Sequence, residues 1–119
     1  MKRILLVDDE RPIREMYRLL LCSEGYQVYE ASSAEEATEF LLGHDVHLVI
    51  LDINMPQVAG PQMKEVIDEY DRDLKVMVAS VYPLERQKKI VANADDYYDK
   101  AQSPELFLKK VQRLLGESN

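Results

Sequence analysis

Short apolar runs that end in polar residues recur along this chain, separated by stretches whose apolar residues have helical spacing. A continuous apolar run of this length is typical of a strand covered on both faces, as in a parallel sheet. The residues that follow the runs are Asp8-Asp9, Asp52, Ser80 and, after the shorter run Tyr97-Tyr98, Asp99-Lys100. If the runs are parallel strands of one sheet, the three carboxylates of Asp8, Asp9 and Asp52, the hydroxyl of Ser80 and the ammonium group of Lys100 lie along one edge.

Strand and helix signals alternate five times, without a linker or repeat. The expected strands cover residues 4–7, 26–31, 47–51, 75–79 and 97–98. The expected helices begin near Pro12, at the cap Ser33, after Gly60, at Leu84 and at the cap Ser103, and they extend to Gly25, Gly43, Tyr70, Asn93 and Leu115. Proline in a first turn, serine at an N-cap and glycine after a last turn are the usual signals of helix ends.

Alternating strands and helices with short connections favour parallel strands joined by right-handed crossovers. We therefore expect an α/β fold, a flavodoxin-like doubly wound five-stranded parallel sheet in the order 2-1-3-4-5 with five helices. Its 119 residues, 1–119, suit a single domain. In that order the first and third strands are neighbours where the winding reverses, and ligands bind outside strand ends there.

The predicted edge has the composition of a magnesium and phosphoryl site. Oxygen ligands suit magnesium rather than zinc, and magnesium binds through one or two carboxylates plus phosphate oxygens. Lys100 offers a point charge to a phosphate. A carboxylate beside a cation and a lysine can act as a nucleophile towards phosphorus, forming an acyl phosphate, and Ser80 can hydrogen-bond a phosphoryl oxygen. Taken singly, each residue is better explained as a loop, turn or surface residue, so the prediction depends on their combination.

Composition narrows the classes of protein. No apolar stretch approaches the roughly 18 residues of a membrane span, and the single cysteine, Cys22, cannot form an internal disulfide. Both features favour a cytoplasmic protein with no membrane association. Residues 1–60 carry 11 acidic and 5 basic residues of a chain whose net charge is −7. This acidic half argues against direct nucleic-acid binding. We expect Cys22, which follows three leucines, to be partly buried.

The chain resembles the receiver domains of two-component response regulators, the CheY-like superfamily. The matching segments are Leu6-Val7-Asp8-Asp9-Glu10, Leu51-Asp52-Ile53-Asn54-Met55-Pro56, Gly60, Ser80 and Asp96-Tyr97-Tyr98-Asp99-Lys100. The resemblance implies that Asp52 accepts a phosphoryl group from a histidine kinase or a phosphotransfer protein. It also implies that Asp8, Asp9, Asp52 and the backbone carbonyl of Asn54 hold magnesium.

The same resemblance implies a signalling switch rather than an enzyme that turns over a substrate. Ser80 and Lys100 would contact the phosphoryl group, and Tyr97 falls at the position of the family's switch aromatic. In the family the hydroxyl at the position of Ser80 moves towards the phosphate and the aromatic residue turns inward. These two movements reshape the surface of the fourth helix, fifth strand and fifth helix for a downstream partner. A homodimer through the last two helices is a further expectation, with Arg86, Lys88 and Lys89 facing Asp95 and Asp96 of a second copy.

Three positions depart from the family pattern. Ala101 replaces a proline that usually follows the lysine in a cis peptide. A cis bond before a non-proline costs about 2.5–4 kcal/mol, so either the strain is tolerated or the loop is trans and positions Lys100 differently. Val81 replaces a small residue, so its branches narrow access to Asp52. Two interpretations of Tyr82 are open. Its side chain screens the phosphoryl group from water, or it packs on Pro83 at the surface.

Three other functions fit parts of the sequence. A pseudo-receiver would keep the fold as a phosphorylation-independent interaction module, but all the acceptor-site residues are present. A phosphatase of the haloacid dehalogenase type needs a second aspartate two residues after its nucleophile, where Asp8 has Glu10 and Asp52 has Asn54. A flavin carrier needs hydroxyls and amides in its first loop, which is acidic here.

Overall fold

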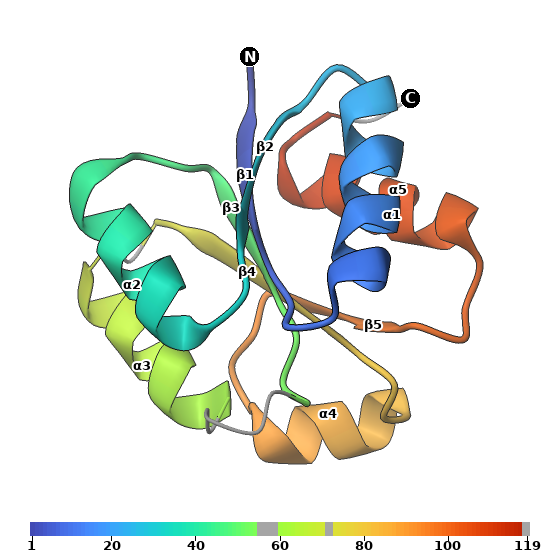
Figure 1. Cartoon of the computed structure of the whole chain (residues 1–119). Coiled ribbons are helices and arrows are strands. Elements are labelled where there is room, and N and C mark those ends of the chain that lie inside the picture. Colours follow the sequence, from blue (N-terminus) through green and yellow to red (C-terminus); the bar gives the residue numbers. More distant parts are fainter. Residues whose placement is uncertain (55–59, 71–72, 118–119) are drawn as a thin grey trace.

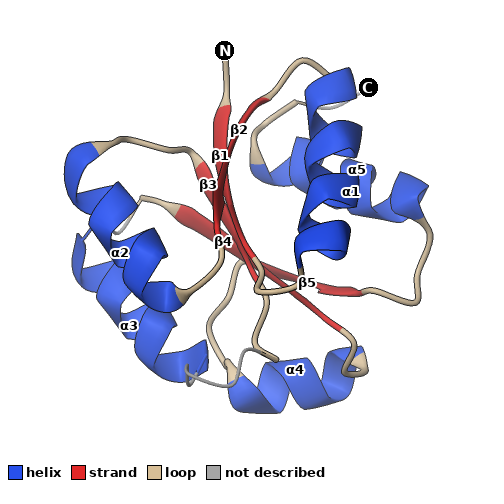
Figure 2. Cartoon of the chain, viewed as in Figure 1, coloured by secondary structure: helices blue, strands red, loops and turns tan. Residues whose placement is uncertain are grey.

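A five-stranded parallel sheet forms the centre of the computed structural model, which describes residues 1–54, 60–70 and 73–117 (Figures 1 and 2). The strands are β1 (Arg3–Val7), β2 (Gln27–Ala31), β3 (Leu48–Leu51), β4 (Lys75–Ser80) and β5 (Asp96–Asp99). The helices are α1 (Arg11–Ser23), α2 (Ala34–Gly43), α3 (Gly60–Tyr70), α4 (Leu84–Ile90) and α5 (Pro104–Leu114). The strand order is β2-β1-β3-β4-β5 and all pairs are parallel, which confirms the predicted α/β fold.

Two layers of helices cover the sheet. Helices α1 and α5 lie on one face, and α2, α3 and α4 lie on the other (Figure 1). The α1–α5 layer is centred on an aromatic cluster: the Phe107 ring lies 4.5 Å from Tyr17 and 5.1 Å from Tyr98. Because both faces are covered, all four residues of β3 are buried. The edge formed by the carboxyl ends of the strands, where the polar residues lie, is therefore the part of the sheet that stays open to a ligand.

Local sequence signals set the ends of several helices. Pro12 lies in the first turn of α1, and Gly25 after its end has a φ of 89°, a conformation that favours glycine. The hydroxyl of Ser33 accepts a hydrogen bond from the N–H of Glu36, and that of Ser103 from the N–H of Leu106. These are the expected N-caps of α2 and α5.

Some predicted details are wrong. Helix α4 ends at Ile90 rather than Asn93, since Val91 has an extended backbone and begins the approach to β5. Cys22 is exposed, not partly buried, because α1 buries Tyr17 and Leu21 and Cys22 follows on the next side of the helix. No helix in the described ranges has both the length and the apolar character needed to cross a bilayer.

The cap of α5 gives a test of the fold. We expect Ser103→Ala to lower the free energy of unfolding by about 1 kcal/mol, since the N–H of Leu106 loses its acceptor. The measurement is urea denaturation followed by circular dichroism. Ser23→Ala is the control, because Ser23 lies at the exposed end of α1 and its loss should change stability by less than about 0.5 kcal/mol. Equal losses in the two variants would contradict this account of the cap.

Candidate functional site

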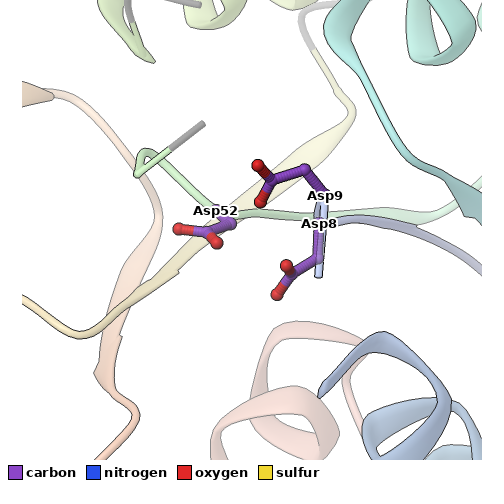
Figure 3. Close-up of side chains that lie close together, drawn as sticks. All are labelled: Asp8, Asp9 and Asp52. Carbon is purple, nitrogen blue, oxygen red and sulfur yellow. The ribbon is translucent and has the colours of Figure 1, made fainter. Parts of the chain in front are cut away.

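Three carboxylates meet at the ends of β1 and β3. One oxygen from each of Asp8, Asp9 and Asp52 lies within 4.8 Å of the others (Figure 3). Asp8 and Asp52 are each 2% exposed, whereas Asp9 is open to solvent. Pairing of the two strands brings the residues together, since the N–H of Asp52 donates to the carbonyl of Val7 at 3.0 Å. The structure thus places the three acids as the strand order predicted.

Lys100 reaches the carboxylates from the end of β5. Its Nζ lies 2.8 Å from Oδ2 of Asp8 and 3.0 Å from Oδ2 of Asp52. Its backbone N–H donates to the carbonyl of Ser80 at 2.9 Å, so the start of the loop after β5 is anchored to the end of β4. Residues separated by up to 92 positions are therefore joined in one buried ion-pair network.

Ala101 does not displace Lys100. There are no cis peptide bonds among the described residues, so the Lys100–Ala101 bond is trans. Hydrogen bonds hold the loop instead: Ala101 N–H donates to Oδ1 of Asp99 at 2.8 Å, and Gln102 N–H donates to the carbonyl of Asp99 at 2.8 Å. The hydroxyl of Tyr98 donates to the carbonyls of Gln102 and Ser103. The proline of the family pattern is thus replaced by a hydrogen-bonded turn.

Ser80 is fully buried and points towards the site through Asn54. Its hydroxyl donates to Oδ1 of Asn54 and accepts from the N–H of Tyr82 at 3.1 Å. Asn54 in turn donates its own N–H to Oδ1 of Asp52 at 2.9 Å. Ser80 is therefore linked to Asp52 by hydrogen bonds through one intervening residue, Asn54. The assignment of the Asn54 carbonyl as a metal ligand stays a prediction, and Met55-Pro56 lies outside the described residues.

The charges of the site are unbalanced. Burial raises the pKa of Asp52, and Asp8 adds to the rise, while the Asn54 N–H and the Lys100 ammonium oppose it. Burial alone would lower the pKa of Lys100, but its hydrogen bonds and attraction to Asp8 and Asp52 raise it. The pKa of Asp52 is thus raised mainly by burial, whereas the pKa of Lys100 is raised by its two carboxylate partners.

A divalent cation fits this arrangement. The cluster offers only oxygen ligands, which suit a hard cation such as magnesium, and its two unbalanced negative charges match the charge of that ion. Asp9 is exposed and can supply an oxygen at low cost in burial. Asp8 and Asp52 each have an Oδ1 that Lys100 does not contact and that accepts one backbone N–H, and these oxygens keep a lone pair for a metal. The residues that can hold the metal are thus Asp8, Asp9 and Asp52.

Tyr97 points inward in this structure. It is 8% exposed, its hydroxyl donates to the carbonyl of Val91 and accepts from the N–H of Ala94 at 3.2 Å. These bonds tie β5 to the end of α4. The Lys88 ammonium lies 5.9 Å from the ring centroid. The structure thus links Tyr97 to the helix that the family resemblance associates with switching.

The two departures after Ser80 have different surroundings. Val81 is 61% exposed, so its side chain is not packed into the site. Tyr82 is half-buried and packs under Arg86, whose guanidinium carbon lies 4.0 Å from the ring centroid. Packing on Arg86 was not among the two readings of Tyr82 from the sequence.

Sequence reasoning missed two residues that support the site. Arg14 donates to the carbonyl of Asp8 at 2.7 Å and pairs with Glu30, which steadies the loop after β1. Gln87 is fully buried and contacts the loop after Ser80. The available signal for Gln87 was its spacing, since it lies three residues after Leu84 and three before Ile90 on the apolar stripe of α4.

Comparisons with known proteins agree with the site. Residues 4–112 match the family model of the response regulator receiver domain, and the chain therefore belongs to this family. The response regulator TrrA from Thermotoga maritima, solved in complex with Mg²⁺-BeF, is 36% identical with a TM-score of 0.88, covering 97% of this chain and 100% of that chain. A CheY-like receiver domain protein from Methanospirillum hungatei is 28% identical with a TM-score of 0.90, covering 98% and 94%.

The relatives also include longer proteins. The transcriptional regulatory protein SrrA of Staphylococcus aureus is 31% identical over 113 residues, which are 94% of this chain and 47% of that protein. The chain thus spans about half the length of the curated relatives it matches. A receiver domain is a signalling module and not a dehalogenase-type phosphatase or a flavin carrier, so membership of the family removes those two alternatives.

The acidic cluster predicts a response to magnesium. We expect Mg²⁺ to raise the melting temperature by mass action, corresponding to about 2.7 kcal/mol at one hundred times the dissociation constant. Asp9→Asn should require about tenfold more magnesium, since one ligand charge is lost at a partly exposed position. Asp45→Asn, at an exposed acid outside the cluster, should respond like the unsubstituted protein. A flat response of the unsubstituted protein would contradict the metal assignment.

The raised pKa of Asp52 predicts a stability effect without metal. In EDTA at neutral pH, Asp52→Asn should melt a few degrees higher, because the variant removes a carboxylate whose charged form is disfavoured in the folded state. The free-energy cost of this charge is absent below the unfolded pKa of about 3.9. It grows as the pH rises from that value to the folded pKa and is complete above the folded pKa. The difference in melting temperature should therefore shrink on acidification. A variant that melts lower than the unsubstituted protein at neutral pH would contradict this sign.

Proposed function

We propose that this chain is a phosphoacceptor receiver of a two-component system, in which Asp52 takes a phosphoryl group from a histidine kinase or a phosphotransfer protein. The observation that supports it most is the buried Asp52, bonded to Lys100 and beside the acids Asp8 and Asp9. The neighbour TrrA, at 36% identity, was also solved in complex with the histidine kinase ThkA, with a TM-score of 0.88.

The chemistry follows from charge and position. A carboxylate oxygen of Asp52 attacks phosphorus and the bond from phosphorus to the donor nitrogen breaks. The donor ring, already protonated on its other nitrogen, takes the electron pair of that bond and leaves as neutral imidazole. The product is an acyl phosphate on Asp52. Lys100 lies where its ammonium can balance charge that develops on the phosphoryl oxygens. Asp8, Asp9, Asp52 and the carbonyl of Asn54 would hold magnesium, which would supply further charge neutralisation.

Ser80 would report the phosphoryl group. Its single hydroxyl proton is donated to Asn54, so the hydroxyl must leave that acceptor before it can donate to a phosphoryl oxygen. Tyr97 connects the neighbouring strand to α4 through Val91, so a change at the end of β4 has a path to the surface of α4, β5 and α5. That surface would then bind the downstream partner.

Bonds within the chain already occupy the acidic residues that a homodimer through the same surface would use. Asp96 already pairs with Lys110 and Arg113, at 3.6 and 2.9 Å. Asp95 accepts the N–H of Val76 at 2.7 Å. A second copy that used these acids would therefore have to replace existing bonds. The proposed location is the cytoplasm, in keeping with the single free cysteine.

Phosphorylation by a small donor tests the proposal. Incubation with phosphoramidate and magnesium should add one phosphoryl group, detected by intact mass, and Asp52→Asn should abolish the adduct. Asp45→Asn is the control and should be labelled like the unsubstituted protein. Ser80→Ala should slow labelling about tenfold, the effect of one lost hydrogen bond to a charged group. Absence of any adduct at saturating donor would favour the phosphorylation-independent pseudo-receiver.

A further inference from the structure

Gln87 in α4 is a buried amide surrounded by backbone carbonyls. It is 0% exposed, and its Nε2 lies 2.7 Å from the carbonyl oxygen of Tyr82 and 3.0 Å from that of Tyr98. A third carbonyl, that of Ser80, lies 3.4 Å away. An amide nitrogen has two protons, so the two shorter contacts are its main hydrogen bonds. Gln87 therefore joins the turn after β4 to the strand β5.

The turn that Gln87 holds is the one that positions the Ser80 hydroxyl. Tyr82 gives its carbonyl to Gln87 and donates its N–H to Oγ of Ser80 at 3.1 Å. The carbonyl of Ser80 accepts the N–H of Lys100 at 2.9 Å. The backbone on both sides of the Ser80 side chain is thus fixed, on one side by Lys100 and on the other by Gln87.

The other end of the amide indicates why glutamine is present. Its Oε1 is buried with no hydrogen-bond partner among the residues that the structure describes. A buried acceptor without a donor destabilises the folded state, and an apolar side chain of similar size would avoid that cost. Filling space therefore does not explain Gln87, whereas its two N–H donors do.

We propose that Gln87 is a positioning residue for phosphoryl transfer, acting through Ser80. By clamping the Ser80–Tyr82 turn to β5, it keeps the hydroxyl within a side-chain rotation of the phosphoryl position. Without the clamp the turn can take other conformations, and the hydroxyl spends less time where it can donate. This inference rests on the proposed function of Asp52 and adds a residue outside the acidic cluster.

A double-mutant cycle on phosphoramidate labelling tests the inference. Gln87→Met keeps the size of the side chain and removes both donors. We expect it to lower the rate constant at saturating donor about tenfold, close to the effect of Ser80→Ala. In the Ser80→Ala background the same change should lower the rate less than about twofold, since the group through which it acts is gone. The magnesium dependence of the melting temperature should stay unchanged, because the metal ligands are intact.

Controls separate positioning from loss of structure. Gln112→Met makes the same substitution on α5 and should leave labelling unchanged. Gln87→Glu is the second variant if Gln87→Met does not fold. It keeps the shape, loses at least one donor and should show the same dependence on Ser80. Melting curves establish folding for each.

The outcomes are distinct. Equal slowing with and without Ser80, or no slowing in a folded Gln87 variant, would overturn the inference while labelling of Asp52 still supported the proposed function. Failure to label the unsubstituted protein would overturn both.

Discussion

The buried contact of Lys100 with Asp8 and Asp52 is the interaction on which the site depends. Carboxylates at the ends of two neighbouring strands repel each other, and burial makes their charge still less favourable. The ammonium relieves part of this repulsion, at 2.8 and 3.0 Å from the two acids. It does not balance Asp9 as well, and the pKa of Asp52 stays raised. The remaining negative charge gives the site its affinity for a cation.

The order of the sheet explains why Lys100 and Ser80 are positioned together. Strand β4 lies between β3 and β5, so a lysine after β5 must pass the end of β4 to reach Asp52. The carbonyl of Ser80 accepts the N–H of Lys100, which fixes this crossing point. The turn built by Asp99 and Ala101 then directs the side chain inward without the proline of the family pattern. One hydrogen bond thus couples the hydroxyl and the ammonium of the site.

The sequence was sufficient for the sheet order and for the residues at its edge, because both follow from alternation and from the direction of parallel strands. It was not sufficient for contacts that depend on side-chain rotamers. The bond from Ser80 to Asn54 and the packing of Arg86 on Tyr82 belong to this kind. The burial of Gln87 could be read from its spacing, but its three carbonyl neighbours come from segments whose approach only the folded structure shows.

Hydrogen bonds of single side chains help to position helix α4. It has 7 residues, and Gln87 is its buried residue. Gln87 joins it to Tyr98 of β5, and the hydroxyl of Tyr97 bonds the carbonyl of Val91 just after its end. A short helix held by these polar contacts and by the partly buried Leu84 and Ile90 can shift at a lower cost than α5, which is packed through an aromatic cluster. Both contacts come from consecutive residues of β5, and Lys100 directly follows this strand, so the charge of the site and the position of α4 are linked through one segment.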